Sequence, residues 1–229
     1  MRIWLAAALL WGVPAAAQDG AWFGPGYFNN WAFNQQADAM LRRSHKTIFN
    51  ESVEASLRRG GASSRAPRTQ VAPTNPSDVR QVADELAAGF PAAERRKAAT
   101  LFADLFARYG ELERRLGVQR GDPAGATAAL IAASYMAHAD AEVSDAGFRA
   151  LYGQMRKLAP DAATAREQQG PITMAILATY LAATREALKQ SPDAARAAAL
   201  HEAGGRYLRA LLGVDPDRVR IGDGGLAIS

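Results

Sequence analysis

The sequence predicts an all-α protein: a single bundle of about six helices, preceded by an irregular aromatic arm, one N-terminal helix and a flexible linker. Three observations lead to this prediction. Apolar residues recur at spacings of three and four through most of residues 77–226. Residues that cap or end helices separate these runs. A strand-like alternation of apolar and polar residues is confined to the short segment "RVRI" at residues 218–221.

Four segments follow one another along the chain. We expect a signal peptide at residues 1–17, an aromatic arm with a first helix at residues 18–58, a disordered linker at residues 59–76 and the helical domain at residues 77–226. The linker "RGGASSRAPRTQVAPTNP" combines glycine, serine, proline and arginine with almost no large apolar residue, a composition typical of flexible connections.

The first 17 residues have the features of a secretory signal. Arg2 precedes an apolar run over residues 3–13, and three alanines at 15–17 supply the small residues that signal peptidase requires. The run is too short to span a bilayer comfortably. We therefore expect cleavage after Ala17 and an exported chain that begins at Gln18; an uncleaved N-terminal anchor is the alternative. No later segment is apolar for long enough to cross a membrane.

The composition limits the available chemistry. The chain has no cysteine, which excludes disulfides, cysteine nucleophiles, zinc–cysteine sites and iron–sulfur clusters. Its net charge is +4, and loss of Arg2 from 27 basic residues, against 23 acidic ones, leaves +3. The basic residues are spread along the sequence, whereas a nucleic-acid-binding face needs a concentrated basic patch. We therefore expect no nucleic-acid partner.

The aromatic arm contains the segment "AWFGPGYFNNWAF" at residues 21–33, in which Gly-Pro-Gly excludes a regular helix. The composition favours a strap that buries its aromatic rings on the protein's own core. The alternative is a segment that binds a partner or a glycan. The candidate partner-binding residues are Trp22, Phe23, Tyr27, Phe28 and Trp31.

Capping residues place the first four helices of the domain. Ser77 is the expected cap of the first helix, and Pro91 lies in the first turn of the second. Asp122 and Pro123 are a favourable cap and first residue for the third helix, and Ser144 is the expected cap of the fourth.

Two more helices complete the domain, one over residues 172–189 and one that starts after Pro192 and ends at Gly213. We expect the glycine-rich tail beyond them to be loose. The helical spacing predicts that the following residues point inward: Leu101, Phe102, Leu105, Phe106, Tyr109, Leu112, Leu116, Leu130, Ile131, Tyr135, Met136, Phe148, Leu151, Met155, Met174, Leu177, Leu181, Leu188, Leu200, Tyr207, Leu208 and Leu211.

The segment "AHADAEVSD" at residues 137–145 gathers a histidine and three acidic residues. A calcium-binding EF-hand loop that started at Asp140 would need glycine sixth and glutamate twelfth, where this chain has Asp145 and Leu151. A turn explains every residue, because a histidine suits the end of one helix and Ser144 the start of the next. The alternative, a metal site, would use His138, Asp140 and Glu142.

Other catalytic or metal-binding patterns are weaker. The histidines His45, His138 and His201 each lie on or beside an apolar helical face, where a hydrogen-bonded structural histidine is commoner than a shared metal site. The "GxSxG" word of serine hydrolases and a phosphate-binding glycine loop are both absent. Glu111 and Glu113 are two positions apart and so point to different sides of their helix. We therefore assign no catalytic residue and no cofactor.

Two segments resemble a known family: "LGVQRGDPAGATAALIAASYMA" at residues 116–137 and "YLRALLGVDPDRVRIGDGGL" at residues 207–226. Both place "LGV" before an aspartate-proline turn. They are similar to a bacterial family of signal-bearing helical proteins of unknown function, DUF6683, over most of residues 77–226. The resemblance implies export and an all-helical fold, and it brings no catalytic residues.

These observations favour an exported, non-enzymatic binding protein of the bacterial cell envelope, which contacts another envelope protein through the aromatic arm. Two alternatives stay open: an envelope hydrolase that acts on peptidoglycan, and a periplasmic metal-binding protein. The sequence leaves open whether the chain stays in the periplasm or enters the medium, and which oligomeric state it adopts.

Overall fold

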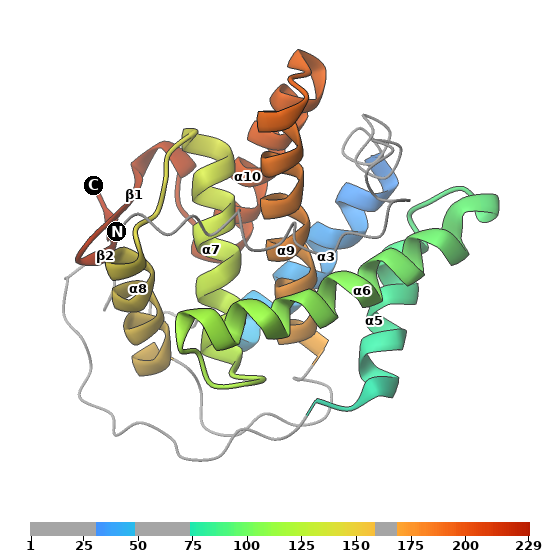
Figure 1. Ribbon diagram of the computed structural model, residues 1–229, viewed down its shortest axis with the longest axis horizontal. Helices are drawn as coiled ribbons and strands as arrows, with labels where there is room; N and C mark the ends of the chain where they lie inside the picture. Colours follow the sequence, from blue (N-terminus) through green and yellow to red (C-terminus); the bar gives the residue numbers. More distant parts are fainter. Residues whose placement is uncertain (1–30, 49–73, 159–168) are drawn as a thin grey trace.

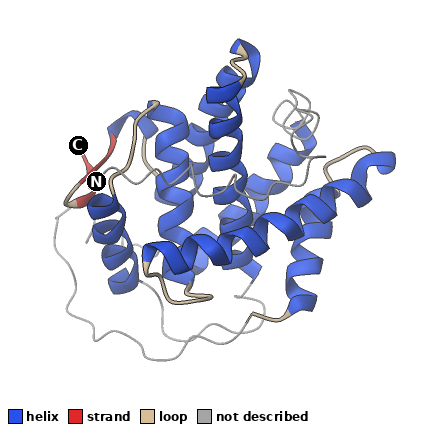
Figure 2. Ribbon diagram, viewed as in Figure 1, coloured by secondary structure: helices blue, strands red, loops and turns tan. Residues whose placement is uncertain are grey.

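The computed structural model describes residues 31–48, 74–158 and 169–229, with the side chains of residues 33–42 in the first of these ranges. The fold is all-α, as predicted, with one small two-stranded sheet at the C-terminal end of the chain (Figures 1 and 2). Its elements are α3 (Trp31–Ile48), α5 (Pro76–Ala87), α6 (Ala92–Leu116), α7 (Pro123–Ala139), α8 (Asp145–Leu158), α9 (Gln169–Gln190), α10 (Ala194–Leu212), the 3-10 helix η2 (Pro216–Arg218), β1 (Val219–Gly222) and β2 (Gly225–Ile228).

Several predictions fall outside the described residues. They include the signal peptide, most of the linker, and the side chains of Trp22, Phe23, Tyr27 and Phe28. Trp31 is the first residue of α3, but its side chain, like that of His45, is also outside them. In the part of the chain that the structure covers, no helix is long and apolar enough to span a bilayer.

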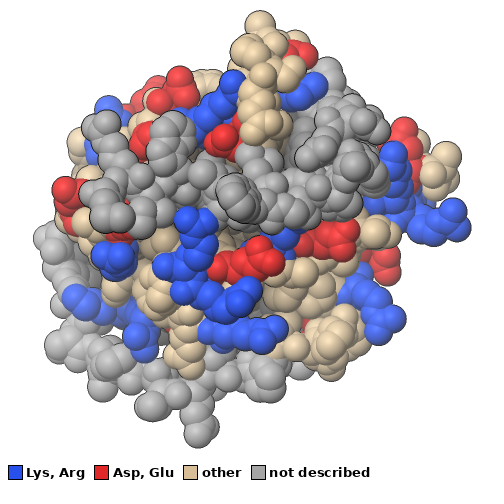
Figure 3. Space-filling model, viewed as in Figure 1, with Lys and Arg blue, Asp and Glu red and all other residues tan. Residues whose placement is uncertain are grey.

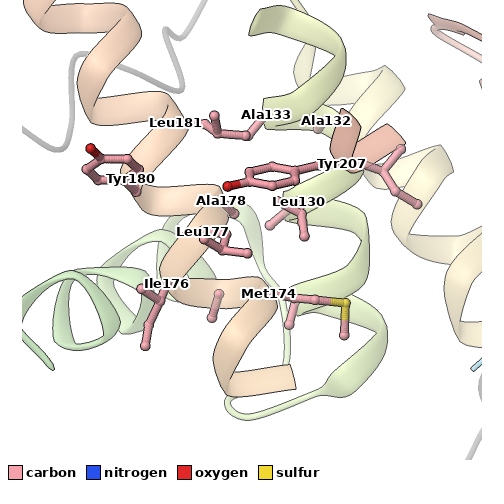
Figure 4. Packing of buried hydrophobic residues seen from close by; sticks show 14 of the residues in the cluster. Leu130, Ala132, Ala133, Met174, Ile176, Leu177, Ala178, Tyr180, Leu181 and Tyr207 are labelled. Carbon is pink, nitrogen blue, oxygen red and sulfur yellow. The ribbon is translucent and has the colours of Figure 1, made fainter. Parts of the chain in front are cut away.

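Helix α7 is the centre of the bundle. Residues 124–137 are all buried, so α7 is apolar around its whole circumference instead of having one apolar face. It packs against α8, α9 and α10, and Figure 1 shows it between α8 and α9. Figure 4 shows how the contact is filled: the ring of Tyr207 on α10 lies with Ala133 and Leu181 on one side and Leu130 and Leu177 on the other.

Two consecutive glycines let α10 approach α7 closely. A Cβ atom at Gly204 would lie 2.6 Å from the carbonyl oxygen of Ser134 and 2.9 Å from the backbone nitrogen of His138. A Cβ atom at Gly205 would lie 2.9 Å from the imidazole Nδ1 of His138. Because these contacts are shorter than any real Cβ makes, only glycine fits at this crossing.

Helix α3 contributes to the same core. Phe33 is fully buried in a cluster of aromatic rings, stacked on Phe102 with ring centroids 5.7 Å apart and tilted against Phe90 at 5.3 Å. Ala37 and Leu41 follow it on the buried face of α3. The last aromatic residue of the segment at residues 21–33 is therefore a core residue of the bundle.

Most predicted helix ends are confirmed. Asp122 caps α7, Ser144 caps α8 through the backbone nitrogen of Gly147 at 3.0 Å, and Gly213 ends α10 in the left-handed conformation. The prediction for Ser77 was wrong. Asn75 caps α5 and accepts a hydrogen bond from the Ser77 nitrogen at 3.0 Å, because the following proline occupies the first helical position.

The predicted inward-facing residues are buried, except that Phe106, Leu116 and Leu188 are half-buried. Pro91 lies directly before α6 and its carbonyl oxygen accepts the first hydrogen bonds of that helix.

The prediction of a loose C-terminal tail was wrong, whereas "RVRI" does contribute to a strand. β1 and β2 form an antiparallel hairpin in which Val219 pairs with Ile228 and Ile221 with Leu226. Val219, Ile221 and Leu226 are buried, and the hairpin packs on α8. Glycine-rich composition favours a loose segment, but burial of these three side chains outweighs it.

Candidate functional site

The segment at residues 137–145 forms the predicted turn between two helices. His138 lies in the last turn of α7, and Asp140 follows that helix with a positive φ of 46°. Aspartate adopts this left-handed conformation more readily than most residues, so it reverses the chain without a glycine. Ser144 then caps α8, which begins at Asp145.

The acidic side chains of the turn bind to α9. Arg185, whose side chain is 10% exposed, donates a hydrogen bond from Nη1 to Glu142 at 2.7 Å and contacts Asp140 through Nη2 at 3.4 Å. Lys189 Nζ contacts the same Glu142 oxygen at 3.2 Å. Partial burial raises the pKa of Glu142, but the hydrogen bonds and charges of Arg185 and Lys189 outweigh it and lower that pKa below its ordinary value.

The histidine of the turn faces α10 and the C-terminal segment. Its Nε2 atom lies 2.9 Å from Oδ1 of Asp217, and its Nδ1 atom lies 3.4 Å from the carbonyl oxygen of His201. The His138 ring also stacks on the His201 ring, with centroids 4.4 Å apart and planes at 26°. Both ring nitrogens of His138 face hydrogen-bond acceptors; a neutral ring donates to one of them and a protonated ring to both.

The turn also holds the C-terminal hairpin. Ser144 Oγ donates a hydrogen bond to Oδ1 of Asp223 at 2.5 Å. Gly147, one turn into α8, lies so close to the hairpin that a Cβ atom there would be 2.7 Å from the carbonyl oxygen of Gly222. The turn at residues 137–145 is thus a junction that joins α7, α8, α9, α10 and the hairpin.

This geometry separates the residues of the metal-site alternative. Asp140 and Glu142 are paired with Arg185, while His138 is directed at Asp217 and His201. Across residues 31–48, 74–158 and 169–229, no group of three or more histidine or acidic side chains is arranged to hold a metal ion. His138 and His201 do meet, as stacked rings.

Comparison with known proteins identifies the family. A family model described as "Family of unknown function (DUF6683)" matches residues 2–229. The chain belongs to the DUF6683 family. No curated protein and no solved structure matches it. The two segments that carry the resemblance in the sequence meet at the junction, because residues 116–137 lead into His138 and residues 207–226 contain Asp217 and Asp223.

Sequence reasoning missed the partners in the junction of this DUF6683 protein. Arg185 lies 43 positions from Glu142, and Asp217 lies 79 positions from His138. Local spacing carries no information about such pairs. The sequence held one indication of these partners: the segment "DPDRVRIGDGG" is rich in aspartates, and two of them, Asp217 and Asp223, contact His138 and Ser144.

A second polar cluster lies where α6 meets α7. Glu113 is buried and accepts a hydrogen bond from the Gly121 nitrogen at 2.8 Å. Asp122 accepts one from the Ala124 nitrogen at 3.0 Å and one from the Tyr152 hydroxyl at 2.6 Å. These carboxylates therefore hold the loop between the two helices. As the two-residue spacing predicts, the neighbouring Glu111 is exposed.

Burial changes the acid–base behaviour of this cluster. It raises the pKa of Glu113, although the Gly121 N–H opposes the shift. Burial, together with the hydrogen bond to Asp122, raises the pKa of Tyr152 to about 12. Burial raises the pKa of Tyr109 well above its ordinary value. Both phenols therefore stay protonated at neutral pH, and that of Tyr152 donates its hydrogen bond to Asp122.

Proposed function

We propose that this DUF6683 protein is an exported, non-enzymatic binding protein of the bacterial cell envelope. In this proposal the aromatic arm contacts the partner, which is another envelope protein. The proposed binding residues are Trp22, Phe23, Tyr27, Phe28 and Trp31. Two features support the idea: the signal-like first 17 residues, and the internal pairing of the acidic side chains that a metal ion or a reaction would need.

The observation that carries the proposal is the position of Phe33. This residue lies two positions after Trp31, the last of the candidate binding residues, and its ring packs against those of Phe90 and Phe102 in the core. A short aromatic segment that is attached to a packed helix loses less conformational freedom on binding than one at the end of a long free chain. Tryptophan and tyrosine are also the residues most often found at the energetic centre of interfaces.

The experiment is a crosslinking capture from envelope extract with three baits, each beginning at Gln18. The first is the wild-type chain. The second carries Trp22→Ser, Phe23→Ser, Tyr27→Ser and Phe28→Ser. The third carries Asn29→Ala and Asn30→Ala, which alter the same segment and retain its aromatic rings. Substitution is preferable to truncation at Ser77, because truncation would remove α3 and Phe33 from the core.

We expect the wild type and the asparagine variant to capture one specific envelope protein that the serine variant fails to capture. Equal melting temperatures would establish that all three baits are folded. Equal capture by all three baits would contradict the role of the arm, and capture of no partner would contradict the proposed function.

A further inference from the structure

The fold gathers basic side chains that are spread out in the sequence. Arg114 and Arg115 lie in the last turn of α6, Arg120 lies in the loop that follows, and Arg149 and Lys157 lie on α8. All five are exposed. Figure 3 shows Lys and Arg atoms grouped over the end of α6 and beside it over α8. We call these five residues the basic surface.

Contacts between the loop and α8 establish that the two parts of the basic surface are neighbours. The Gln119 nitrogen lies 3.5 Å from the Tyr152 hydroxyl, and Arg156 Nε lies 3.8 Å from Oδ2 of Asp122. Arg156 also lies over the Tyr152 ring, 5.8 Å from its centroid. The loop that carries Arg120 therefore packs on Tyr152 and Arg156 of α8, next to Lys157.

The charge of the basic surface is only partly offset within the described part of the chain: Arg120 lies close enough to Glu113 for its charge to oppose the rise in the pKa of that carboxyl. None of its five residues forms an ion pair with another described residue. Glu111 and Asp145 lie one helical turn before the arginines of α6 and α8 and form no ion pair with them. Glu113 and Asp122 are buried and accept hydrogen bonds from backbone nitrogens.

A purely structural explanation accounts for part of this surface. Basic residues in the last turn of a helix stabilise its partly negative end, which explains Arg114, Arg115 and Lys157. It does not explain Arg120, which lies in a loop, or Arg149, which lies in the first half of α8. The excess charge therefore points to an anionic partner.

The surroundings of the basic surface favour a lipid surface as that partner. Leu116 and Leu158, the last residues of α6 and α8, are half-buried, as is the ring of Tyr152. Basic side chains beside partly exposed apolar and aromatic ones match the charged headgroup layer and the apolar boundary beneath it. Guanidinium groups also pair with phosphate oxygens in a bidentate manner.

We propose that the basic surface binds anionic phospholipid headgroups and holds the protein peripherally at a membrane surface. The proposal goes beyond the function proposed above. It depends on export only for access to that membrane, and it is independent of the aromatic arm.

Vesicle flotation tests this proposal. The chain beginning at Gln18 is mixed with vesicles of phosphatidylcholine alone, or of phosphatidylcholine with phosphatidylglycerol. The test variant carries Arg114→Glu, Arg115→Glu and Arg149→Glu. The control carries Arg80→Glu, Arg96→Glu and Arg209→Glu, which change the net charge equally at exposed positions elsewhere. Since all chains share the aromatic arm, its contribution to binding is the same in each.

We expect wild type and control to float with the anionic vesicles, to stay unbound with the neutral ones, and to be released by salt. Binding of the test variant to anionic vesicles should be weaker by about ten-fold or by a larger factor, because each reversal replaces an attraction by a repulsion. A second variant, Arg114→Gln with Arg115→Gln and Arg149→Gln, should give a smaller loss and keeps the helix ends free of added acidic charge.

Equal flotation of test variant and control would overturn the proposal. So would equal binding of the wild type to both kinds of vesicle, or binding to an acidic protein or an oligonucleotide without any binding to anionic vesicles. If the flotation experiment overturned the lipid proposal while the crosslinking experiment captured a partner, the proposed function of the aromatic arm would still stand.

Discussion

Gln154 on α8 forms both backbone hydrogen bonds of Leu226 on β2. Its side-chain Oε1 accepts from the Leu226 nitrogen at 2.8 Å, and its Nε2 donates to the Leu226 carbonyl oxygen at 3.1 Å. The amide thus takes the place of a neighbouring strand. Gly225 makes room for it, because a Cβ atom at that position would lie 2.5 Å from the same Oε1 atom.

The first prediction concerns this contact. We expect Gln154→Ala to lower the free energy of unfolding by about 2 kcal/mol, since it leaves two part-buried backbone groups without their partner. Urea unfolding measures the change. Gln119→Ala is the matched control, because Gln119 is exposed and its side chain makes no hydrogen bond in the described residues. Equal stability of the two variants would show that the hairpin is held by its apolar side chains alone.

The close approach of α7 and α10 gives the second prediction. Gly204→Ala should destabilise the protein by about 2–3 kcal/mol, because the added methyl group meets backbone atoms of Ser134 and His138 that cannot move independently. Gly110→Ala is the control. Gly110 lies within α6 with no heavy atom near its Cβ position, so alanine there should stabilise the protein by about 0.5–1 kcal/mol. If Gly204→Ala were as stable as Gly110→Ala, the helices would not be in the contact described.

Much of this fold can be predicted from local sequence. The spacing of Leu101, Leu105 and Tyr109, and the Asp122–Pro123 cap, depend on a few neighbouring residues, and the structure has both. The central position of α7 is harder to predict, since its many alanines suit both exposed and buried helices. The close contact that places it against α10 depends on Gly204, which lies on that other helix. The hairpin escaped prediction because it is held against α8 by contacts such as that of Gln154 with Leu226, 72 positions away.

The junction was likewise predictable only where it depends on neighbouring residues. Backbone preferences at Asp140 and Ser144 predict a turn. The pairing of Glu142 with Arg185 depends on the packing of α9 beside that turn, which local spacing does not specify.

The third prediction uses the ion pair of Glu142. Its pKa is lowered in the folded state below the ordinary value of 4.5, so the ionised carboxylate stabilises the protein above pH 4.5, and this stability is lost as the pH falls through the folded-state pKa. At neutral pH, Glu142→Gln should be less stable than wild type by about 0.5–1 kcal/mol, because the pair is partly exposed. The difference should vanish in acid. Glu111→Gln, at an exposed carboxylate, should show a smaller change, and a pH-independent effect of Glu142→Gln would contradict the prediction.

The fourth prediction has the opposite sign. Burial raises the pKa of Asp38 on α3, although the charges of Arg206 and Arg42 oppose the shift. The stabilising contribution of this group is complete below its ordinary pKa of 3.8 and is lost as the pH rises through the folded-state value. At neutral pH the buried charge is therefore unfavourable.

We expect Asp38→Asn to stabilise the protein at neutral pH by about 0.5 kcal/mol, a modest amount because solvent still reaches part of the carboxylate. The gain should shrink as the pH approaches 3.8. Thermal unfolding at a series of pH values measures it. A variant less stable than wild type at neutral pH would mean that the arginine charges dominate over burial.

The turn at residues 137–145 is a structural junction in which Glu142 pairs with Arg185 and His138 contacts Asp217. The most direct test is the melting temperature of the protein with and without added zinc, copper or calcium. An ion that binds the folded state must raise that temperature. We expect no change with any of the three ions. A rise that His138→Gln or Asp140→Asn abolishes would contradict the structural role and establish a metal site at the turn.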